Sequence, residues 1–354
     1  MTDTMDSDAG VVALEIVDHA IKDGDATKKQ FPPHIYELSI NVRATWQAQS
    51  TSNAGSNGSN RLMPRRQCLA DSTETDACSG NIAKHAHAQL AAEYLEAAGC
   101  SLCPACKARD GRRAAALTDQ PDTKNLSIEW IVRNCGLCDT HGFLVTAKNA
   151  SSDGSTEARQ RLSKHSLIEF SFALALPERH AETIQVVTRM GDSKDEGQML
   201  MKMTARSGEY AYCVRYKCAG IGLDTDKWRL ILADEEERGR RHRAMLLALR
   251  DGLLSPQGAL TATMLPHLTG LKGVIVVCPS TGRAPIYSAL QDDWISRLCA
   301  LESETCIVAP FETIDTFNLL MQDLIEDTHP ALPAACQRSS ESSVGAGNAR
   351  DQLA

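Results

Sequence analysis

Aromatic side chains are scarce in this 354-residue sequence, at 5% of residues, so aliphatic side chains must fill most of its core. No apolar run approaches the length of about 18 residues that a transmembrane helix needs. The longest runs, 244–249 and 273–278, match one helix segment and one strand. The N-terminus carries Asp3, Asp6 and Asp8 instead of the basic residues that open a secretion signal. We therefore expect a soluble, cytoplasmic protein.

Motifs of several common enzyme classes are also missing. The sequence has no Gly-x-Ser-x-Gly, no phosphate-binding loop and no His-Glu-x-x-His. Asp71, Glu74 and Asp76 could bind a metal ion, although a solvated loop is the simpler interpretation. Hydrolytic catalysis is therefore only weakly indicated, and we expect that the protein is not an enzyme.

An excess of positive charge is absent too. The net charge is −8, which argues against bulk attraction to nucleic acid. The surplus acids gather near the ends, in residues 1–33 and 323–354, while the middle of the chain is nearly neutral and contains local basic clusters. Binding of nucleic acid in a local groove thus stays open.

Cysteine, by contrast, is abundant. Thirteen cysteines without an export signal favour reduced thiols and a metal site over disulfides. Cys103-Pro-Ala-Cys106 and Cys135-Gly-Leu-Cys138 can each present two thiolates, and together they predict a closed, structural four-thiolate Zn²⁺ site. The 28 residues between the pairs exceed the usual spacing of about 15–20. Replacement of a ligand by Cys100 or His141, two unrelated thiol pairs, or a redox pair are the alternatives.

The order of predicted elements indicates an α+β fold. Alternating apolar residues predict a strand over 38–47, and Ser79 caps a helix that Gly99 ends. The other predicted elements are a flexible loop at 50–60, a buried strand at 166–176, hairpin arms at 184–190 and 198–205 with a tip at 191–197, a strand at 210–218, a helix opening at 234–237, and a last strand at 274–278. Without the insertion and the hairpin, this order is the β-α-β-β-α-β plan of ferredoxin-like folds.

Small polar and basic residues between positions 50 and 87 are suited to a chain of phosphates. Amides could bind sugars or phosphates, arginines add charge, and a helix N-terminus offers free N–H groups. The candidates are Asn53, Asn57, Asn60, Arg61, Arg65, Arg66, Ser79, Lys84, His85 and His87. A mobile surface loop with solvated arginines is the alternative.

Two further clusters have a plain and a functional interpretation. The arginines of 238–243 most simply form a solvated helix face that pairs with Glu235–Glu237. Met199, Met201 and Met203 alternate along a hairpin arm and so share one strand face. They could belong to the core or wedge against nucleic-acid bases.

Several stretches, in this order, resemble the DevR-type backbone subunits of type I CRISPR surveillance complexes (the Cas-seven family, within the RAMP superfamily). They are Leu38-Ser-Ile-Asn-Val-Arg-Ala, Ser52-Asn-Ala-Gly-Ser-Asn-Gly, Pro64-Arg-Arg66, Asp76-Ala-Cys-Ser-Gly-Asn-Ile-Ala-Lys-His85, Cys135-Gly-Leu-Cys-Asp-Thr-His-Gly142, Ser255-Pro-Gln-Gly-Ala259, Leu265-Pro-His-Leu268 and Leu271-Lys-Gly-Val-Ile275. The similar stretches span residues 36–280, most of the chain.

The resemblance implies a modified ferredoxin-like (RRM-like) palm with inserted zinc-containing fingers and a thumb β-hairpin. The implied domains are an acidic extension (1–33), the palm (34–99 and 143–322, with the thumb at about 179–206), the cysteine-rich zinc insertion (100–142) and an acidic, partly disordered tail (323–354). Copies of such subunits stack along the crRNA in a helical filament, with other Cascade subunits, and present the guide to target DNA. The resemblance places Arg43 on the polar palm face.

Two alternatives compete with this function in antiviral defence. Related RAMP proteins cut target RNA with an acidic residue before the first helix, where Asp71 or Asp76 lies. The chain could also be a stand-alone, zinc-dependent nucleic-acid regulator.

Overall fold

A computed structural model describes residues 30–57, 61–119, 126–146, 161–189 and 199–333. Asn60, the predicted hairpin tip at 191–197 and most of both acidic ends lie outside these residues. Within the described part, no helix has both the length and the apolar character needed to cross a membrane.

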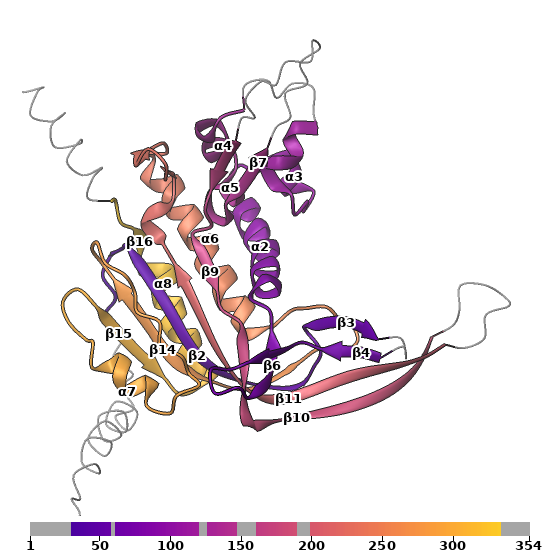
Figure 1. Ribbon diagram of the computed structural model, residues 1–354. Coiled ribbons are helices and arrows are strands. Elements are labelled where there is room, and N and C mark those ends of the chain that lie inside the picture. Colours follow the sequence, from indigo (N-terminus) through magenta and orange to yellow (C-terminus); the bar gives the residue numbers. More distant parts are fainter. Residues whose placement is uncertain (1–29, 58–60, 120–125, 147–160, 190–198, 334–354) are drawn as a thin grey trace, which may run out of the picture.

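A ten-stranded sheet forms the centre of the molecule (Figure 1). Its main path runs β15-β14-β2-β11-β10-β6-β5, and each of these neighbours is antiparallel to the next. The strands are β2 (Glu37–Gln49), β5 (Arg66–Cys68), β6 (Glu74–Cys78), β10 (Ala173–Arg189), β11 (Met199–Tyr216), β14 (His267–Cys278) and β15 (Ile307–Phe311). Off this path, β3 (Asn53–Asn57) pairs with β4 (Arg61–Pro64), and β9 (Ile168–Phe170) pairs with β11.

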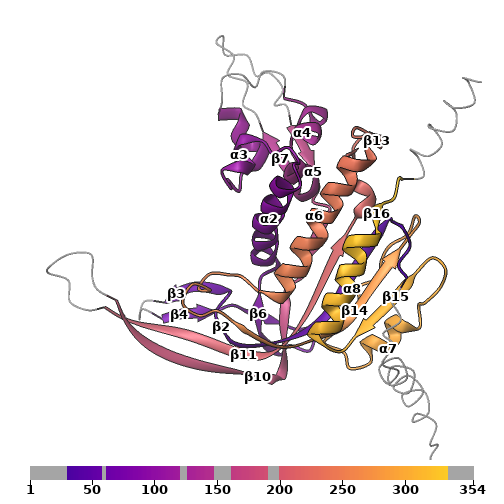
Figure 2. The ribbon, with the colours of Figure 1, turned by 180° about the vertical axis from the view of Figure 1, so that it is seen from behind.

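Helices cover both faces of this sheet (Figures 1 and 2). One face carries α2 (Gly80–Ala97), α6 (Glu235–Leu254) and α8 (Ile314–Asp327), and the other carries α7 (Trp294–Cys299). The predicted strand at 38–47 is confirmed as part of β2, but its second face is not exposed. Ser39 donates to the carbonyl of Pro285 and Asn41 accepts from the amide of Tyr287, so the segment before α7 buries those polar side chains.

The helix ends follow their predicted caps. Ser79 accepts a hydrogen bond from the amide of Asn81 at the start of α2, and Asp234 accepts from the amides of Glu236 and Glu237 at the start of α6. Gly99 adopts a positive φ of 72° just after α2, a conformation that glycine reaches without strain.

Three predicted elements need correction. The strand at 166–176 divides into β9 and β10, because Ser171 and Phe172 separate a segment that pairs with the end of β11 from one that pairs with β6. The loop predicted at 50–60 contains strand β3, which pairs in an antiparallel register with β4, just after the predicted loop. The strand at 274–278 is not the last, since β15 and β16 (His329–Pro330) follow it; β16 pairs in parallel with β1 (His34–Ile35).

The expected domain boundaries also shift. Position 322/323 falls inside α8, where Leu324 and Ile325 are buried in the core, so this part of the acidic tail belongs to the fold. The insertion continues beyond residue 142, because β7 (Phe143–Thr146) and β8 (Arg161–Lys164) form a separate two-stranded sheet. Its other elements are α3 (Pro104–Lys107), the 3₁₀ turn Arg113–Asp119, α4 (Ile128–Asn134) and α5 (Gly136–His141).

The arginines of α6 are not a solvated face. Arg240 does pair with Glu236 and Glu237, as predicted. Arg238 and Arg241, however, are buried. Arg238 donates to the carbonyls of Ile221 and Ala331, and Arg241 donates to the carbonyl of Val132. These buried guanidinium groups therefore donate to main-chain carbonyls from three distant parts of the chain. The carbonyls belong to the segment after the 3₁₀ turn Cys218–Gly220, to the insertion and to the C-terminal segment.

The hairpin of β10 and β11 extends beyond the sheet after a sharp bend (Figure 1). The register of β11 shifts near Gly208 against both β10 and β2. A Cβ on Gly208 would lie 2.6 Å from the carbonyl oxygen of Arg179, so only glycine allows this close approach. The same two strands therefore form part of the central sheet before the bend and the projecting arm after it.

A buried ion pair fixes the arm beside α2. Arg206 donates from Nη1 to Oδ1 of Asp76 at 2.6 Å, and from Nη2 to the carbonyl of Ser52 at 2.8 Å. The hydroxyl of Tyr210 and the amide of Gln49 donate to the other oxygen of Asp76. Strands β2, β6 and β11 thus meet at one carboxylate.

Replacing Asp76 by alanine leaves Arg206 buried without its counter-ion. We expect Asp76→Ala to lower the free energy of unfolding by about 3–5 kcal/mol, measured by urea denaturation. Asp71→Ala is the matched control, because Asp71 is exposed and accepts a hydrogen bond only within its own turn. Equal urea midpoints for both variants would show that the ion pair does not stabilise the fold.

Candidate nucleic-acid surface and metal centre

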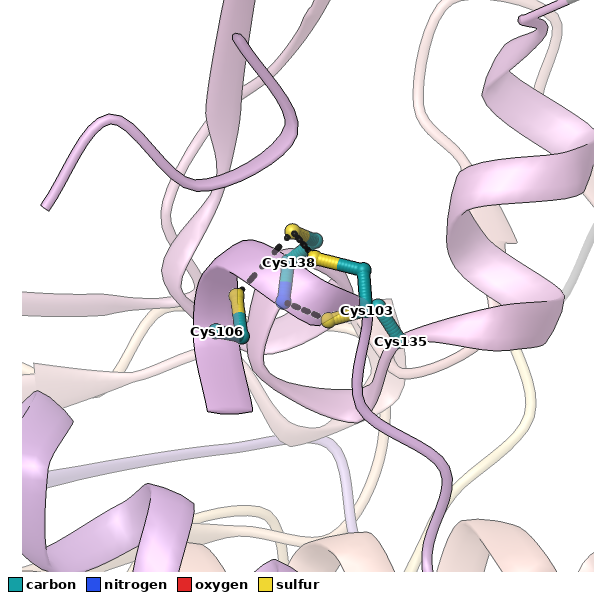
Figure 3. A group of neighbouring side chains, drawn as sticks. All are labelled: Cys103, Cys106, Cys135 and Cys138. Atoms are coloured by element: carbon teal, nitrogen blue, oxygen red, sulfur yellow. Dashed lines mark hydrogen bonds between the residues drawn. The ribbon is translucent and has the colours of Figure 1, made fainter. Parts of the chain in front are cut away.

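Four buried cysteines from the two predicted pairs come together in the insertion (Figure 3). Cys103 and Cys106 flank the start of α3, and Cys135 and Cys138 flank the start of α5. Their sulfur atoms all lie within 4.8 Å of one another. The sulfur atoms of Cys106 and Cys138 are 3.6 Å apart, and those of Cys103 and Cys138 are 3.9 Å apart. Sulfurs bound tetrahedrally to zinc at about 2.3 Å would be about 3.8 Å apart, so the four side chains fit this ion.

The two spare ligand candidates lie elsewhere. His141 Nε2 is 2.9 Å from Nδ1 of His87, in a contact between α5 and α2. Cys100 lies beside Glu237 and the α6 arginines, and burial raises its pKa to about 11. Convergence of the two Cys-x-x-Cys pairs also excludes the alternative of two unrelated thiol pairs.

The cysteine cluster is anchored to the core through Asp139, which follows Cys138. This buried carboxylate accepts hydrogen bonds from Arg241 at 3.0 Å, from the amide of Gly222 at 2.9 Å, and from Lys164. Arg241 also bonds Glu237 of its own helix. Two buried cations and two carboxylates therefore hold α5, α6 and β8 together.

The N-terminus of α2 opens onto a cleft of about 390 Å³. Its lining residues are Ser79, Gly80, Asn81, Lys84, His165, Ser166, Ile168, Glu169, Phe170 and Phe172. Burial, followed by the nearby charge of Arg113, lowers the pKa of Lys84, while Glu169 opposes the shift. The cleft thus combines the positive end of the α2 dipole, a half-buried cation and an exposed aromatic ring.

A hydrogen-bonded chain joins this helix start to the predicted basic loop. Ser52 Oγ accepts from Arg65 Nε at 3.1 Å and from the Ser79 amide at 3.3 Å. Arg65 also donates to the carbonyl of Asn53. Arg66 is 43% exposed and pairs with Glu182 on β10 at 2.9 Å. The structure therefore brings Arg65, Arg66, Ser79 and Lys84 to one region, at the base of the projecting hairpin.

Two predicted contacts lie inside the protein instead. Arg43 is 4% exposed and donates to the carbonyl of Ala289, because the segment before α7 covers its strand face. His87 is buried among α2, α5 and α6, and burial lowers its pKa to about 4. Neither side chain is available at the surface for RNA.

The remaining candidates differ in their surroundings. His85 is exposed next to Gln89, and Met201 is half-buried on β11. The side chains of Asn57, Arg61 and Met199 are outside the described set, although their strands are paired.

The sequence reasoning missed the apolar side chains on the other face of the hairpin. Ile184, Val186 and Leu200 are 47%, 60% and 59% exposed. Cross-strand pairing of Thr188 with Leu200 places all three on one face. Glu182, Ile184, Val186 and Thr188 are spaced by two and so share one strand face. This spacing is the signal in the sequence that could have identified the apolar pair.

Three buried histidines make stability depend on pH. Burial lowers the pKa of His87 to about 4 and of His242 to about 3, and lowers that of His141 as well. The unfolded chain therefore binds protons first as the pH falls below about 6.5, and the folded state loses stability.

We expect the free energy of unfolding to be constant above about pH 7 and to fall by up to about 1.4 kcal/mol per pH unit and histidine below pH 6.5. Urea denaturation at pH 7.5 and 5.5 measures this fall. His242→Gln should make it shallower, whereas His267→Gln, at an exposed position, should not. A pH-independent midpoint would contradict the expectation.

Comparisons with known proteins place these features in a family. The model of the family described as "CRISPR-associated negative auto-regulator DevR/Csa2" matches residues 40–297. One similar solved chain, described as "CRISPR RNA-guided surveillance complex, pre-nicking", is 12% identical with a TM-score of 0.42, over 81% of this chain and 99% of that one. Another, described as "CRISPR RNA-guided surveillance complex", is 13% identical with a TM-score of 0.43, over 82% and 98%.

A sequence search of curated proteins finds no match. The family match, in contrast, begins in β2 and ends in α7, and so includes the cysteine cluster, the α2 cleft and the projecting hairpin. Because it spans most of the sequence, this chain belongs to the DevR/Csa2 family of CRISPR-associated proteins.

Proposed function

We propose that the protein is a backbone subunit of a CRISPR RNA-guided surveillance complex and that it holds the crRNA by its phosphates. The observation that carries this proposal is the region around the α2 N-terminus. There, the positive end of the α2 dipole, Lys84 and Arg65 lie beside the base of the hairpin. Family membership supports the same function.

We also propose that the sheet is a ferredoxin-like palm. Numbered along the chain, β2, β9–β10, β11 and β14 are the four strands of a β-α-β-β-α-β unit, with α2 and α6 as its helices. Their observed antiparallel order, fourth-first-third-second, supports this arrangement. The projecting part of β10 and β11 is then the thumb, and the insertion with the cysteine cluster forms the fingers.

Holding a guide requires contacts to its backbone only, because base pairing reads the target sequence. The N-terminus of α2 attracts phosphate through the positive end of its dipole, while Ser79 already accepts the amides of Asn81, Ile82 and Ala83. Lys84 adds a positive charge within the same cleft. The proposed partners are therefore the crRNA, target DNA paired to it, further copies of this chain along the RNA, and the other Cascade subunits in the cytoplasm.

The thumb would contact bases through apolar side chains. Ile184, Val186 and Leu200 are more exposed than the half-buried Met201, so they form the better wedge. This assigns the wedge to the face of the hairpin opposite to Met201.

We propose holding rather than cutting as the activity. The nuclease alternative relied on Asp71 or Asp76. Asp76 is 2% exposed, and Arg206, Tyr210 and Gln49 occupy its oxygens. A carboxylate engaged in this way is poorly placed to bind a catalytic metal and water.

Removing two cations of this region should weaken guide binding. We expect Lys84→Gln combined with Arg66→Gln to reduce the affinity for crRNA and to lower the salt slope of log K by up to about two units, one for each lost phosphate contact. Arg297→Gln is the control, because this exposed arginine lies on α7, on the other face of the sheet.

Filter binding across a series of salt concentrations measures both quantities. An unchanged slope in the double variant would show that these cations do not contact phosphate. Co-expression with a CRISPR array tests the assembly itself. A large particle with RNA of uniform length supports the proposal, whereas an RNA-free monomer or dimer would favour the regulator alternative.

We propose that the cysteine cluster binds one structural Zn²⁺ per chain through Cys103, Cys106, Cys135 and Cys138. A bound ion would replace the S–H contacts between these thiols and cross-link α3 to α5. All four positions are protein thiols, so the site has no open position for a substrate.

Metal analysis of freshly purified protein should find about one zinc per chain. Cys135→Ser should lose this zinc and lower Tm, whereas Cys100→Ser should keep it, since Cys100 is equally buried but lies outside the cluster. Zinc-free wild-type protein, or full zinc in Cys135→Ser, would contradict the proposal.

A further inference from the structure

The chain has four tryptophans, and they divide evenly between the core and the surface. Trp46 and Trp294 are buried, at 6% and 2% exposure. Trp130 on α4 is 42% exposed, and Trp228, in the turn between β12 (Leu223–Asp224) and β13 (Arg229–Leu230), is 58% exposed. In a sequence with so few aromatic residues, two exposed indoles are a notable use of this side chain.

The two elements that carry these tryptophans, α4 and the β12–β13 turn, are neighbours at the insertion end of the molecule (Figures 1 and 2). Glu129, next to Trp130, accepts from Arg133 of its own helix at 3.1 Å and from Arg229, next to Trp228, at 2.8 Å. This carboxylate ties α4 to the β12–β13 turn. We call Trp130, Arg133, Lys227, Trp228 and Arg229 the tryptophan patch.

The backbone at Trp228 is unusual for so large a residue. Its φ is +50°, in the left-handed region that glycine favours and bulky side chains rarely adopt. More than half of the side chain is nevertheless exposed. Unusual backbone conformations of this kind cluster at functional sites, so Trp228 is a candidate for a contact with a ligand.

We propose that the tryptophan patch binds a single strand of nucleic acid by stacking bases on Trp130 and Trp228. Every base offers a flat face to an indole, so such stacking is independent of sequence. Arg133 and Arg229 are 51% and 57% exposed although both pair with Glu129, and Lys227 is exposed beside Asp226, so phosphates can reach three cations that two carboxylates only partly neutralise.

The strand bound here is distinct from the one proposed for the α2 cleft. That cleft lies at the N-terminus of α2, and the insertion begins after its C-terminus. None of the five residues of the tryptophan patch lines this cleft, so the two regions do not share a side chain. The inference therefore goes beyond guide binding and adds a second nucleic-acid contact.

Oligothymidylate of about 15 nucleotides is the probe, long enough to span one binding site of this kind. Fluorescence anisotropy of the labelled probe measures its affinity for the full-length protein, with crRNA bound wherever it copurifies. Trp130→Ala and Trp228→Gly should each weaken binding about tenfold, within the range expected for loss of one stacked base. Arg297→Gln, on the far face of the sheet, should bind as the wild type does.

The glycine variant makes the test sharp. Trp228→Gly should keep or raise Tm, since glycine relieves the backbone, and yet lose probe binding. Wild-type affinity in a folded Trp228→Gly protein would overturn the inference. Failure of the wild type to bind the probe would overturn it too, and loss of another protein subunit from the variants would then assign the patch to protein docking.

Guide binding is measured on the same variants. The tryptophan variants should retain crRNA, whereas Lys84→Gln with Arg66→Gln should retain oligothymidylate. Loss of crRNA binding therefore tests the proposed guide-holding function, and loss of oligothymidylate binding tests the tryptophan patch, so the two failures can be told apart.

Discussion

The ion pair between Asp76 and Arg206 is the constraint on which the proposed RNA-holding region depends. One buried carboxylate joins β2, β6 and β11, and the same guanidinium reaches the carbonyl of Ser52. Ser52 in turn contacts Arg65 and the start of α2. The thumb, the basic segment and the helix N-terminus therefore share one internal support, because a buried cation of this kind needs every partner to remain in place. Buried contacts therefore position the region that is proposed to hold RNA.

A second buried cluster has the same role for the insertion. Asp139 lies next to a cysteine of the proposed zinc site and receives Lys164, Arg241 and the amide of Gly222. Residues far apart in the sequence thus fix the insertion to α6 by charge, whereas the thiols would fix it internally by metal. A chelator would remove only the proposed metal cross-link and would leave the charged contacts of Asp139 in place. Loss of metal should therefore loosen α3 and α5 while leaving the sheet intact.

Local signals in the sequence predicted the parts of this structure that are themselves local. Period-two alternation located β2, a capping serine located α2, first-turn acids located α6, and the two Cys-x-x-Cys pairs located the four-cysteine cluster. The failures concern burial by distant segments. Arg43 and the arginines of α6 look solvated in the sequence, but carbonyl groups from residues 221–331 cover them in the fold. No pattern within a strand or helix encodes such a partner. The exposed face of the thumb was missed because methionines drew attention to the opposite face.

Because the projecting hairpin bends at Gly208, its length and its direction depend on different residues. Beyond the bend, β10 and β11 are paired in a continuous register from Arg189 and Met199 inward. Adding residues there in matched pairs would lengthen the arm and keep each side chain on its face. Changes at the close contact of Gly208 with Arg179 would instead alter the direction of the arm. The length and the direction of the projecting hairpin can therefore change independently of each other, with no change in the central sheet.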